Sequence, residues 1–251
     1  MLRSRVIPCL LISDGGLNKT EKFKPGKYVG DPLNAVKIFN EKQVDELILI
    51  DIDATVKGRE PDFERLRSIA IESRMPLCYG GGVTTAEQAA KIVSLGFEKV
   101  SVSAAALERP DLIREMALAI GSQSVVVTID VKRVGMFSGY SIFSHNGTRK
   151  HKIDLTDWIK HATQLGAGEI LINSINRDGT FSGYDLDLAR TARSATELPM
   201  TFLGGAGSMA DMEALIKTVG VCGAAAGSLF VFKGTFRAVL INYERPNALV
   251  T

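Results

Sequence analysis

The sequence predicts a single (β/α)₈ barrel built from two similar halves. Short β-branched runs alternate with amphipathic helical stretches, which is typical of βαβ units and a parallel sheet. Several segments recur half a chain later. The length of 251 residues is close to the roughly 250 residues of a typical closed α/β barrel. We therefore expect one domain, with halves at about residues 1–122 and 123–251.

Eight strands and seven helices are expected. The strand-length runs are residues 5–12, 46–52, 76–79, 99–102, 125–129, 169–173, 200–203 and 222–226. The amphipathic stretches are residues 32–42, 63–73, 85–95, 111–120, 156–165, 186–195 and 210–218. The strands are almost continuously apolar, which indicates a sheet covered on both faces. A polar insertion at about residues 135–154 is expected to form a hairpin or a mobile loop that could act as a lid.

The internal repeat favours a barrel over an open sheet. The segment 47–53 (LILIDID) is echoed at 170–176 (ILINSIN), and 80–83 (GGGV) at 204–207 (GGAG). The segment 102–106 (VSAAA) is echoed at 225–229 (AAGSL). A period of half the chain is too long for a solenoid and fits two (βα)₄ halves.

Composition narrows the class of protein. A net charge of +2 gives no positive electrostatic field strong enough to indicate nucleic-acid binding. No apolar segment approaches the ~20 residues that a membrane-spanning helix needs. No signal peptide is evident, so we expect a cytoplasmic protein. The cysteines at 9, 78 and 222 suit reduced, buried thiols, and the histidines at 145, 151 and 161 share no ligand spacing with them. We expect neither a metal nor a cofactor.

Glycine-rich turns follow the third strand of each half, and small residues follow the fourth. Such turns let a ligand approach the backbone amides at the start of the next helix, where anions bind. The alternative is that these glycines only make tight βα turns. Because two sets occur in symmetry, we expect a ligand with two phosphates. The candidate phosphate-binding residues are Gly81, Gly82, Ser103, Asp178, Gly179, Gly204, Gly205, Gly227 and Ser228.

Carboxylates at strand ends are candidates for acid/base chemistry. Asp130 ends a very apolar run, where burial should raise its pKa; its alternative role is a cap or turn. Asp51 and Asp53 follow the second strand, and their alternation allows only one to face the barrel mouth. Lys19, in the first βα loop, either holds an anion or is a solvated lysine.

Four charged residues of alternating sign open the first, second, fourth and sixth barrel strands: Arg5, Glu46, Lys99 and Glu169. At the N-terminal ends of the strands they could form a ring of salt bridges. From spacing alone, a polar plug that seals the bottom of the barrel is the preferred interpretation.

Several segments together resemble the cyclase (synthase) subunit of imidazole glycerol phosphate synthase, over essentially the whole chain. The longest are residues 121–133 (GSQSVVVTIDVKR) and 177–185 (RDGTFSGYD). The resemblance implies a barrel that receives ammonia from a glutaminase subunit docked at its N-terminal face. The ammonia then reacts with a bis-phosphorylated ribulosyl substrate at the mouth. In that family the ring at the bottom of the barrel is the ammonia gate, and all four of its positions match here.

The mouth departs from the family pattern, as in a divergent paralogue. Leu11 stands where the family has its second catalytic aspartate, and Asp130 matches the first. Ser103 and Asn173 replace an asparagine and a threonine of the phosphate sites, and Leu203 replaces a serine. The C-terminal phosphate cluster is kept, and it consists of Asp178, Gly179, Gly204, Gly205, Gly227 and Ser228.

Two hypotheses remain. In the first, the chain is a glutamine-dependent synthase subunit whose ammonia acceptor is either the histidine-pathway intermediate or, because the mouth has changed, a nucleotide-activated amino sugar of surface-polysaccharide (lipopolysaccharide) biosynthesis. Loss of one acid/base group should slow its proton transfer by roughly 10²–10⁴. In the second, the barrel is catalytically silent and only binds and activates the glutaminase.

Overall fold

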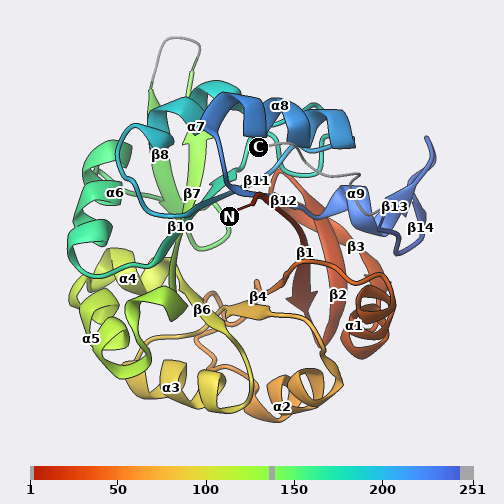
Figure 1. Ribbon diagram of the computed structural model, residues 1–251, viewed down its shortest axis with the longest axis horizontal. Coiled ribbons are helices and arrows are strands. Elements are labelled where there is room, and N and C mark those ends of the chain that lie inside the picture. The colour runs from red at the N-terminus through yellow and green to blue at the C-terminus, as the bar shows by residue number, and fades with distance from the viewer. Residues whose placement is uncertain (1–2, 136–138, 244–251) are drawn as a thin grey trace.

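Eight parallel strands close into a barrel in the computed structural model, which describes residues 3–135 and 139–243. In order they are β1 (Arg5–Ser13), β4 (Leu47–Asp51), β5 (Leu77–Gly80), β6 (Lys99–Val102), β7 (Val125–Arg133), β10 (Glu169–Ser174), β11 (Met200–Leu203) and β12 (Gly223–Ala226). The pairs β12–β1 and β7–β10 complete the ring. Figure 1 looks along the barrel, with the strands inside and the helices outside. The predicted (β/α)₈ fold is confirmed.

Helices cover the outside of the barrel. Those of eight or more residues in the described ranges are α1 (Pro32–Glu41), α2 (Phe63–Glu72), α3 (Ala86–Ser94), α5 (Asp111–Ile120), α6 (Leu155–Gln164), α7 (Leu186–Arg193) and α8 (Met209–Val219). Side-chain caps set several of their starts, among them the capping box of Thr85 and Gln88 at α3. Two short helices that the sequence analysis did not anticipate, α4 (Ala104–Glu108) and α9 (Ser228–Val231), follow β6 and β12.

The alternation of side chains along β1 divides the core into two parts. Val6 and Leu10 pack in the large core between the strands and the helices. Ile7 and Cys9 belong instead to a second cluster inside the barrel. This inner cluster also holds Ile48, Cys78, Val126, Leu171 and Ala225, with Leu11, Ile50 and Leu203 at its margin. The same parity places Arg5 at one end of the interior and Leu11 at the other.

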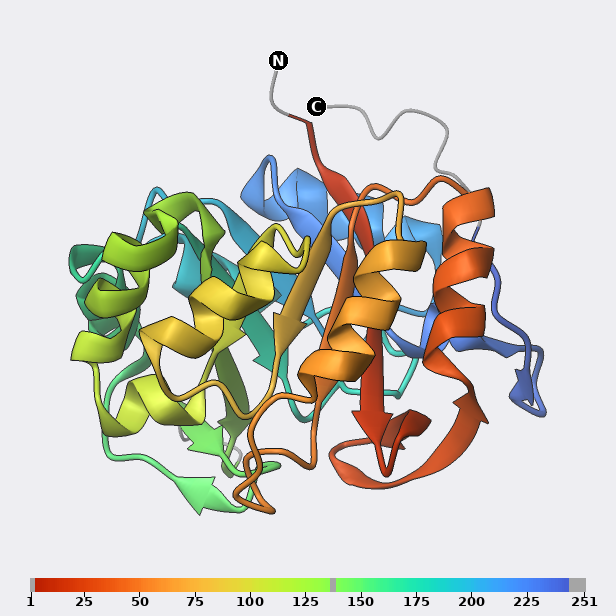
Figure 2. The same ribbon diagram turned by 90° about the horizontal axis from the view of Figure 1, so that it is seen from below.

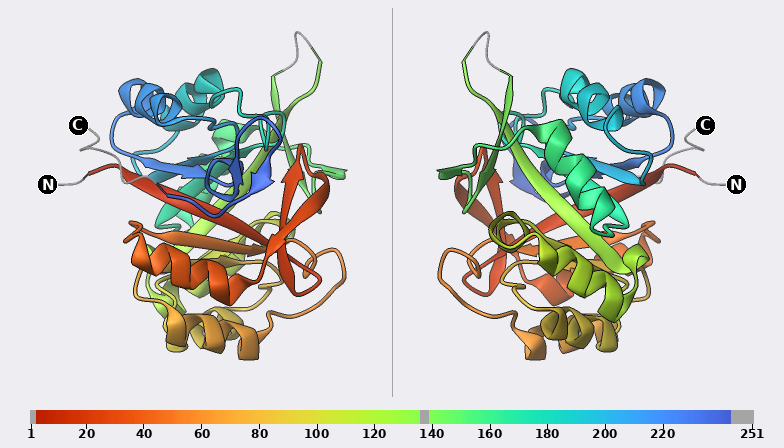
Figure 3. Two further views of the ribbon diagram at one scale, coloured as in Figure 1. Left: turned by 90° about the vertical axis from the view of Figure 1, so that its right-hand side faces the viewer. Right: turned by 90° about the vertical axis from the view of Figure 1, so that its left-hand side faces the viewer.

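Two hairpins extend the barrel strands at their C-terminal end. The first βα loop forms β2 (Gly16–Glu21) and β3 (Lys24–Gly30), and β2 pairs with the end of β1. The polar insertion forms β8 (Tyr140–Ser144) and β9 (Arg149–Lys150), with β8 antiparallel to a longer β7 than expected. Figures 2 and 3 show these hairpins projecting beyond the barrel. The hairpin alternative is confirmed for the insertion, although its residues 136–138 lie outside the described ranges.

Within residues 3–135 and 139–243, no helix is both long and apolar enough to cross a membrane. No group of three or more His, Cys, Asp or Glu side chains there is arranged to hold a metal ion. Cys9, Cys78 and Cys222 are buried free thiols.

Candidate active site

A cavity opens at the C-terminal ends of the strands, between the two hairpins. Figure 2 shows the strand arrowheads converging on this edge of the barrel. Its lining includes residues from β1, β4, β5, β6, β7, β8–β9, β10 and β11. Among them are six predicted site residues and both leucines that depart from the family: Asp51, Gly81, Gly82, Ser103, Asp130, Asn173, Leu11 and Leu203.

Asp130 lies within β7 and not at its end, so it is neither a cap nor a turn residue. Its side chain points into the mouth on the same parity as Val126 and Thr128. Burial raises the pKa of Asp130 to about 7, with a smaller contribution from the negative charge of Asp178. A carboxyl group with this pKa can both donate and accept a proton near neutral pH.

Asn173 lies beside Asp130 on the paired strand β10. Its Nδ2 donates a hydrogen bond of 2.9 Å to Asp130 Oδ1 and favours the charged carboxylate. The amide oxygen of Asn173 is buried and finds no hydrogen-bond donor among the described residues. A buried acceptor without a partner is costly, and it suits a ligand that brings a donor.

Asp51 is the member of its pair that lines the mouth. Its Oδ1 accepts hydrogen bonds from the backbone amides of Asp53 and Ala54 at 2.9 and 3.0 Å. Asp53 instead bonds Ser13, the Asp14 amide and Lys57, and these bonds lower its pKa although burial acts to raise it. Both carboxylates therefore order the loop after β4, and only Asp51 also faces the cavity.

Gly81 shows why the turn after β5 requires glycine. Its φ is +117°, and a Cβ there would lie 2.3 Å from the carbonyl oxygen of Asp51. We expect Gly81→Ala to lower the free energy of unfolding by at least the ~1–3 kcal/mol of a strained residue. Urea titration is the measurement. Gly139→Ala is the control, because a Cβ there would meet nothing within 4 Å among the described residues; equal stabilities of the two variants would contradict this explanation.

The phosphate residues predicted for the C-terminal half lie outside the mouth cavity and surround a buried ion pair. Lys19 Nζ bonds Asp178 Oδ1 at 2.7 Å and the Thr20 carbonyl at 2.7 Å. A Cβ on Gly227 would meet Lys19 Cε at 2.9 Å, and one on Gly179 would meet the Thr20 carbonyl oxygen at 2.6 Å. Lys19 is thus buried, and not a solvated loop lysine.

The rest of this cluster is equally crowded. Gly204 and Gly205 have φ values of +102° and +109°, and a Cβ on either would meet backbone oxygens of Ser174 or Gly183. Ser228 is buried, and its hydroxyl has no hydrogen-bond partner among the described residues; the same is true of the Ser103 hydroxyl across the mouth. Both serines lie in the fourth βα turn of their half: Ser103 directly follows β6, and Ser228 follows Gly227 after β12.

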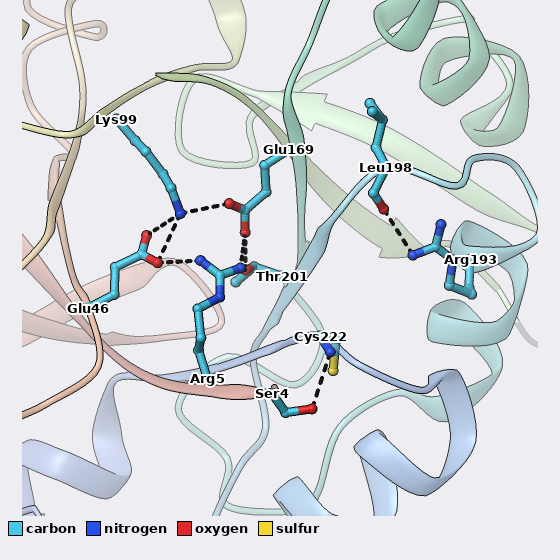
Figure 4. Close-up of polar contacts among 9 residues, drawn as sticks. All are labelled: Ser4, Arg5, Glu46, Lys99, Glu169, Arg193, Leu198, Thr201 and Cys222. Carbon is cyan, nitrogen blue, oxygen red and sulfur yellow. Dashed lines mark hydrogen bonds and ion pairs between the residues drawn. The ribbon is translucent and has the colours of Figure 1, made fainter. Parts of the chain in front are cut away.

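The four charged residues at the other end of the barrel form a closed ring (Figure 4). Arg5 bonds both Glu46 and Glu169, the latter at 2.7 Å. Lys99 Nζ bonds the same two carboxylates, at 2.9–3.0 Å from Glu46 and 2.9 Å from Glu169. The Thr201 hydroxyl adds a bond of 2.5 Å to Glu169 Oε1.

Burial and pairing act differently on the two glutamates of the ring. Burial raises the pKa of Glu46 in spite of the neighbouring Arg5 and Lys99. Burial would also raise the pKa of Glu169, but the two cations and the Thr201 hydroxyl lower it below its ordinary value. The pKa of Lys99 is raised, because its two carboxylates outweigh the effect of burial. The shifts of Glu169 and Lys99 therefore favour their charged forms, whereas that of Glu46 favours its neutral form.

Sequence reasoning missed several residues of the mouth. Thr20 and Phe23 enter it from the first hairpin, and His145 and Asn146 from the second. The tip of the second hairpin is Asn146-Gly147, both with positive φ, and Asn-Gly is the strongest short-range hairpin signal. If this dipeptide had been interpreted as a hairpin turn, the preceding residue, His145, would have been expected near the end of β7.

Comparisons with known proteins show the family to which this chain belongs. The family described as "Histidine biosynthesis protein" matches residues 5–237. A protein of Leptospira interrogans, provisionally named imidazole glycerol phosphate synthase subunit HisF, is 53% identical, over 98% of this chain and 96% of its own. The provisionally named hisF2 of Pseudomonas aeruginosa is 53% identical over 99% of both chains. The HisF subunit of Metallosphaera sedula is 39% identical over 92% of this chain and 91% of its own. The chain belongs to the histidine biosynthesis protein family and, within it, to the HisF barrels.

Proposed function

We propose that this barrel is the synthase subunit of a glutamine amidotransferase with a changed ammonia acceptor. Ammonia from a partner glutaminase enters through the ring, crosses the barrel interior and reacts at the mouth with a phosphorylated acceptor. The observation that carries the proposal is the contrast between the two ends of the barrel. The charged ring is complete, whereas Leu11 occupies the mouth position of the second family aspartate.

The barrel interior suits the passage of neutral ammonia. Between the ring and the mouth lie the side chains of the inner cluster, which are aliphatic apart from two cysteines. Burial raises the pKa of Cys9 to about 12 and raises that of Cys78 as well, so both stay as thiols. No anionic side chain of this cluster would trap ammonia as ammonium, which supports its use as a conduit.

Two observations support a phosphorylated acceptor. The buried hydroxyls of Ser103 and Ser228 have no partner among the described residues, and each stands at a small-residue turn where a phosphate oxygen could accept from it. The residues around Ser228 also match the family's C-terminal phosphate site, with Lys19 as a buried cation beside Gly227.

Two observations support a change of acceptor. Leu11 and Leu203 give the mouth an apolar wall where the family has an aspartate and a serine. The chain is also 53% identical to provisionally named and numbered relatives but 38–39% identical to the HisF subunits of other organisms. A nucleotide-activated amino sugar is an acceptor of this class, because it carries phosphate as well as a group that ammonia can amidinate.

The glutaminase is proposed to dock where the strands begin. Three exposed apolar side chains lie at that end, Ile71 near the end of α2, Leu118 near the end of α5, and Val221 before β12. Apolar side chains exposed beside the ring would be covered by a partner that feeds it. The second candidate function, a silent barrel that only activates the glutaminase, uses the same surface and is favoured by the loss of the acid at Leu11.

The identity of the acceptor can be tested directly when ammonium salts replace the partner glutaminase as the source of ammonia. The chain is incubated with ammonium and either the bis-phosphorylated ribulosyl compound or nucleotide-activated amino sugars, and products are followed by mass spectrometry. Ammonia-dependent product from an amino sugar is expected. Absence of turnover with every phosphorylated acceptor, combined with stimulation of a glutaminase, would favour the silent barrel.

Leu11→Asp tests whether one position blocks the family reaction. The variant restores the second acid/base group, which is worth roughly 10²–10⁴ in rate. We expect it to gain imidazole glycerol phosphate formation that the unaltered chain performs poorly. Leu11→Asn is the matched control, since it has the size of the aspartate without its acidity. Equal activity of the two variants would show that polarity alone, and not proton transfer, was missing.

A further inference from the structure

The β8–β9 hairpin brings a histidine to the mouth. Asp130 pairs with Phe143 across β7 and β8, and the chain reverses two residues beyond Phe143. His145, at the start of the reversal, lines the same cavity as Asp130. Asn146 anchors the tip across the mouth by donating from Nδ2 to the carbonyl oxygen of Ile52 at 2.9 Å.

A buried hydroxyl connects this histidine to a second one. Ser144 is 1% exposed, and its Oγ lies 2.9 Å from His145 Nδ1 and 2.8 Å from His151 Nε2. His151 does not line the cavity and is partly exposed. A serine hydroxyl has one proton, so it donates to one imidazole and accepts from the other. The three side chains therefore form a hydrogen-bonded row from the cavity to the surface.

His145 is one of three charged or titratable side chains among the described residues that line the cavity, and one of its ring nitrogens is available to a ligand. Among its lining residues, the groups that titrate or carry charge are Asp51, Asp130 and His145. Asp51 is held by two backbone amides of its own loop. Around the row, Arg149 and Glu108 face His151; burial and then Arg149 lower the pKa of His151. Because the Nδ1 of His145 faces Ser144, its Nε2 is the nitrogen available to a ligand.

We propose that His145 is the second acid/base group of this mouth, held by Ser144 and connected to solvent through His151. The proposal rests on the proposed function and deepens it, because it supplies the proton transfer that Leu11 cannot perform. An imidazole suits the role, since its charge changes within the range of pH 5–8.

In the proposed reaction, ammonia adds to an electrophilic carbon of the acceptor. The nitrogen lone pair forms the C–N bond, and the bond to the leaving atom breaks with its electron pair going to that atom. His145 Nε2 takes a proton from the new, positively charged nitrogen, and the protonated form of Asp130 gives one to the leaving atom. The Nδ1 proton of His145 then passes to Ser144 Oγ, whose own proton passes to His151 and from there to water.

A purely structural role for His145 is the alternative. Its φ is +52°, a conformation in which histidine, asparagine and aspartate are enriched, so it also suits the turn. His145→Asn keeps that conformation and removes the base. Exposed His161 on α6 provides the matched control, as His161→Asn.

Histidine NMR tests the row without any acceptor, because the chain has only three histidines. Each imidazole is assigned from its single His→Asn variant and titrated from pH 5 to pH 9. In Ser144→Ala we expect the titrations of both His145 and His151 to shift while that of His161 stays. Unchanged titrations of His145 and His151 would overturn the proposal, whether or not an acceptor is known.

The pH profile of ammonia-dependent turnover tests the catalytic role. We expect His145→Asn to lower kcat at least 10-fold and to remove one of the ionisations from the pH profile, with KM changed little; Ser144→Ala should shift that same ionisation. Full activity of His145→Asn would overturn the proposal. A shifted NMR titration without turnover by the unaltered chain would instead count against the proposed function, and the row would stand as a proton relay.

Discussion

Asp130→Asn is expected to lower ammonia-dependent turnover by roughly 10²–10⁴, because the amide can neither donate an acidic proton nor accept one. The geometry should survive, since an asparagine oxygen can still accept from Asn173 Nδ2, which now lies 2.9 Å from the carboxylate. The measurement is kcat with saturating ammonium. A variant with kcat within a factor of two of the unaltered chain would exclude Asp130 as the acid/base group.

The same variant should be more stable at alkaline pH. The pKa of Asp130 is raised by burial to about 7 in the folded chain, so between about pH 4 and pH 7 the folded state holds a proton that the unfolded state has lost. The contribution of Asp130 to stability is therefore greatest at the acidic end of this window and falls as the pH rises through it. At pH 8 we expect the free energy of unfolding of Asp130→Asn to be about 2 kcal/mol higher than that of the unaltered chain. This value is smaller than the full pKa shift implies, because water that enters the mouth screens the charge. At pH 4 the two chains should be equal.

Lys99→Met is expected to cause the largest loss of stability. It leaves Glu46 and Glu169 buried, at 4% and 5% exposure, with Arg5 as their remaining cation in the ring. Removing one partner of a buried ion pair costs about 3–5 kcal/mol. Denaturant unfolding is the measurement. Arg190→Met, which breaks the exposed pair with Asp187, should cost less than about 1 kcal/mol and serves as the control.

The double variant Lys99→Met, Glu46→Gln separates charge balance from packing. It returns the ring to one cation and one anion, Arg5 and Glu169, which remain 2.7 Å apart. Part of the lost stability should therefore return, so that the two substitutions are not additive. Additive losses would mean that the four side chains stabilise the barrel independently, and that the ring is not a coupled unit.

Much of this molecule could be predicted because a barrel strand follows a simple rule. Side chains alternate between the interior and the helix layer, so a single strand links the two ends of the barrel. Lys99 and Ser103 share one parity, as do Glu169 and Asn173, and the structure places the first of each pair in the ring and the second at the mouth. The strand boundaries were less predictable, since β7 continues to Arg133 only because β8 pairs with it.

The sequence by itself determined the fold, the order of the strands and which side chains face the interior, because these follow from local periodicity and from the repeat. Only the tertiary structure decided which contacts the side chains at the mouth make and how deeply they are buried. The pairing of Lys19 with Asp178 joins residues 159 positions apart, and the raised pKa of Asp130 comes from burial that many elements provide together. The approach of His145 depends on how the second hairpin folds back over the barrel. Contacts of this kind depend on three-dimensional closure, which no local pattern encodes.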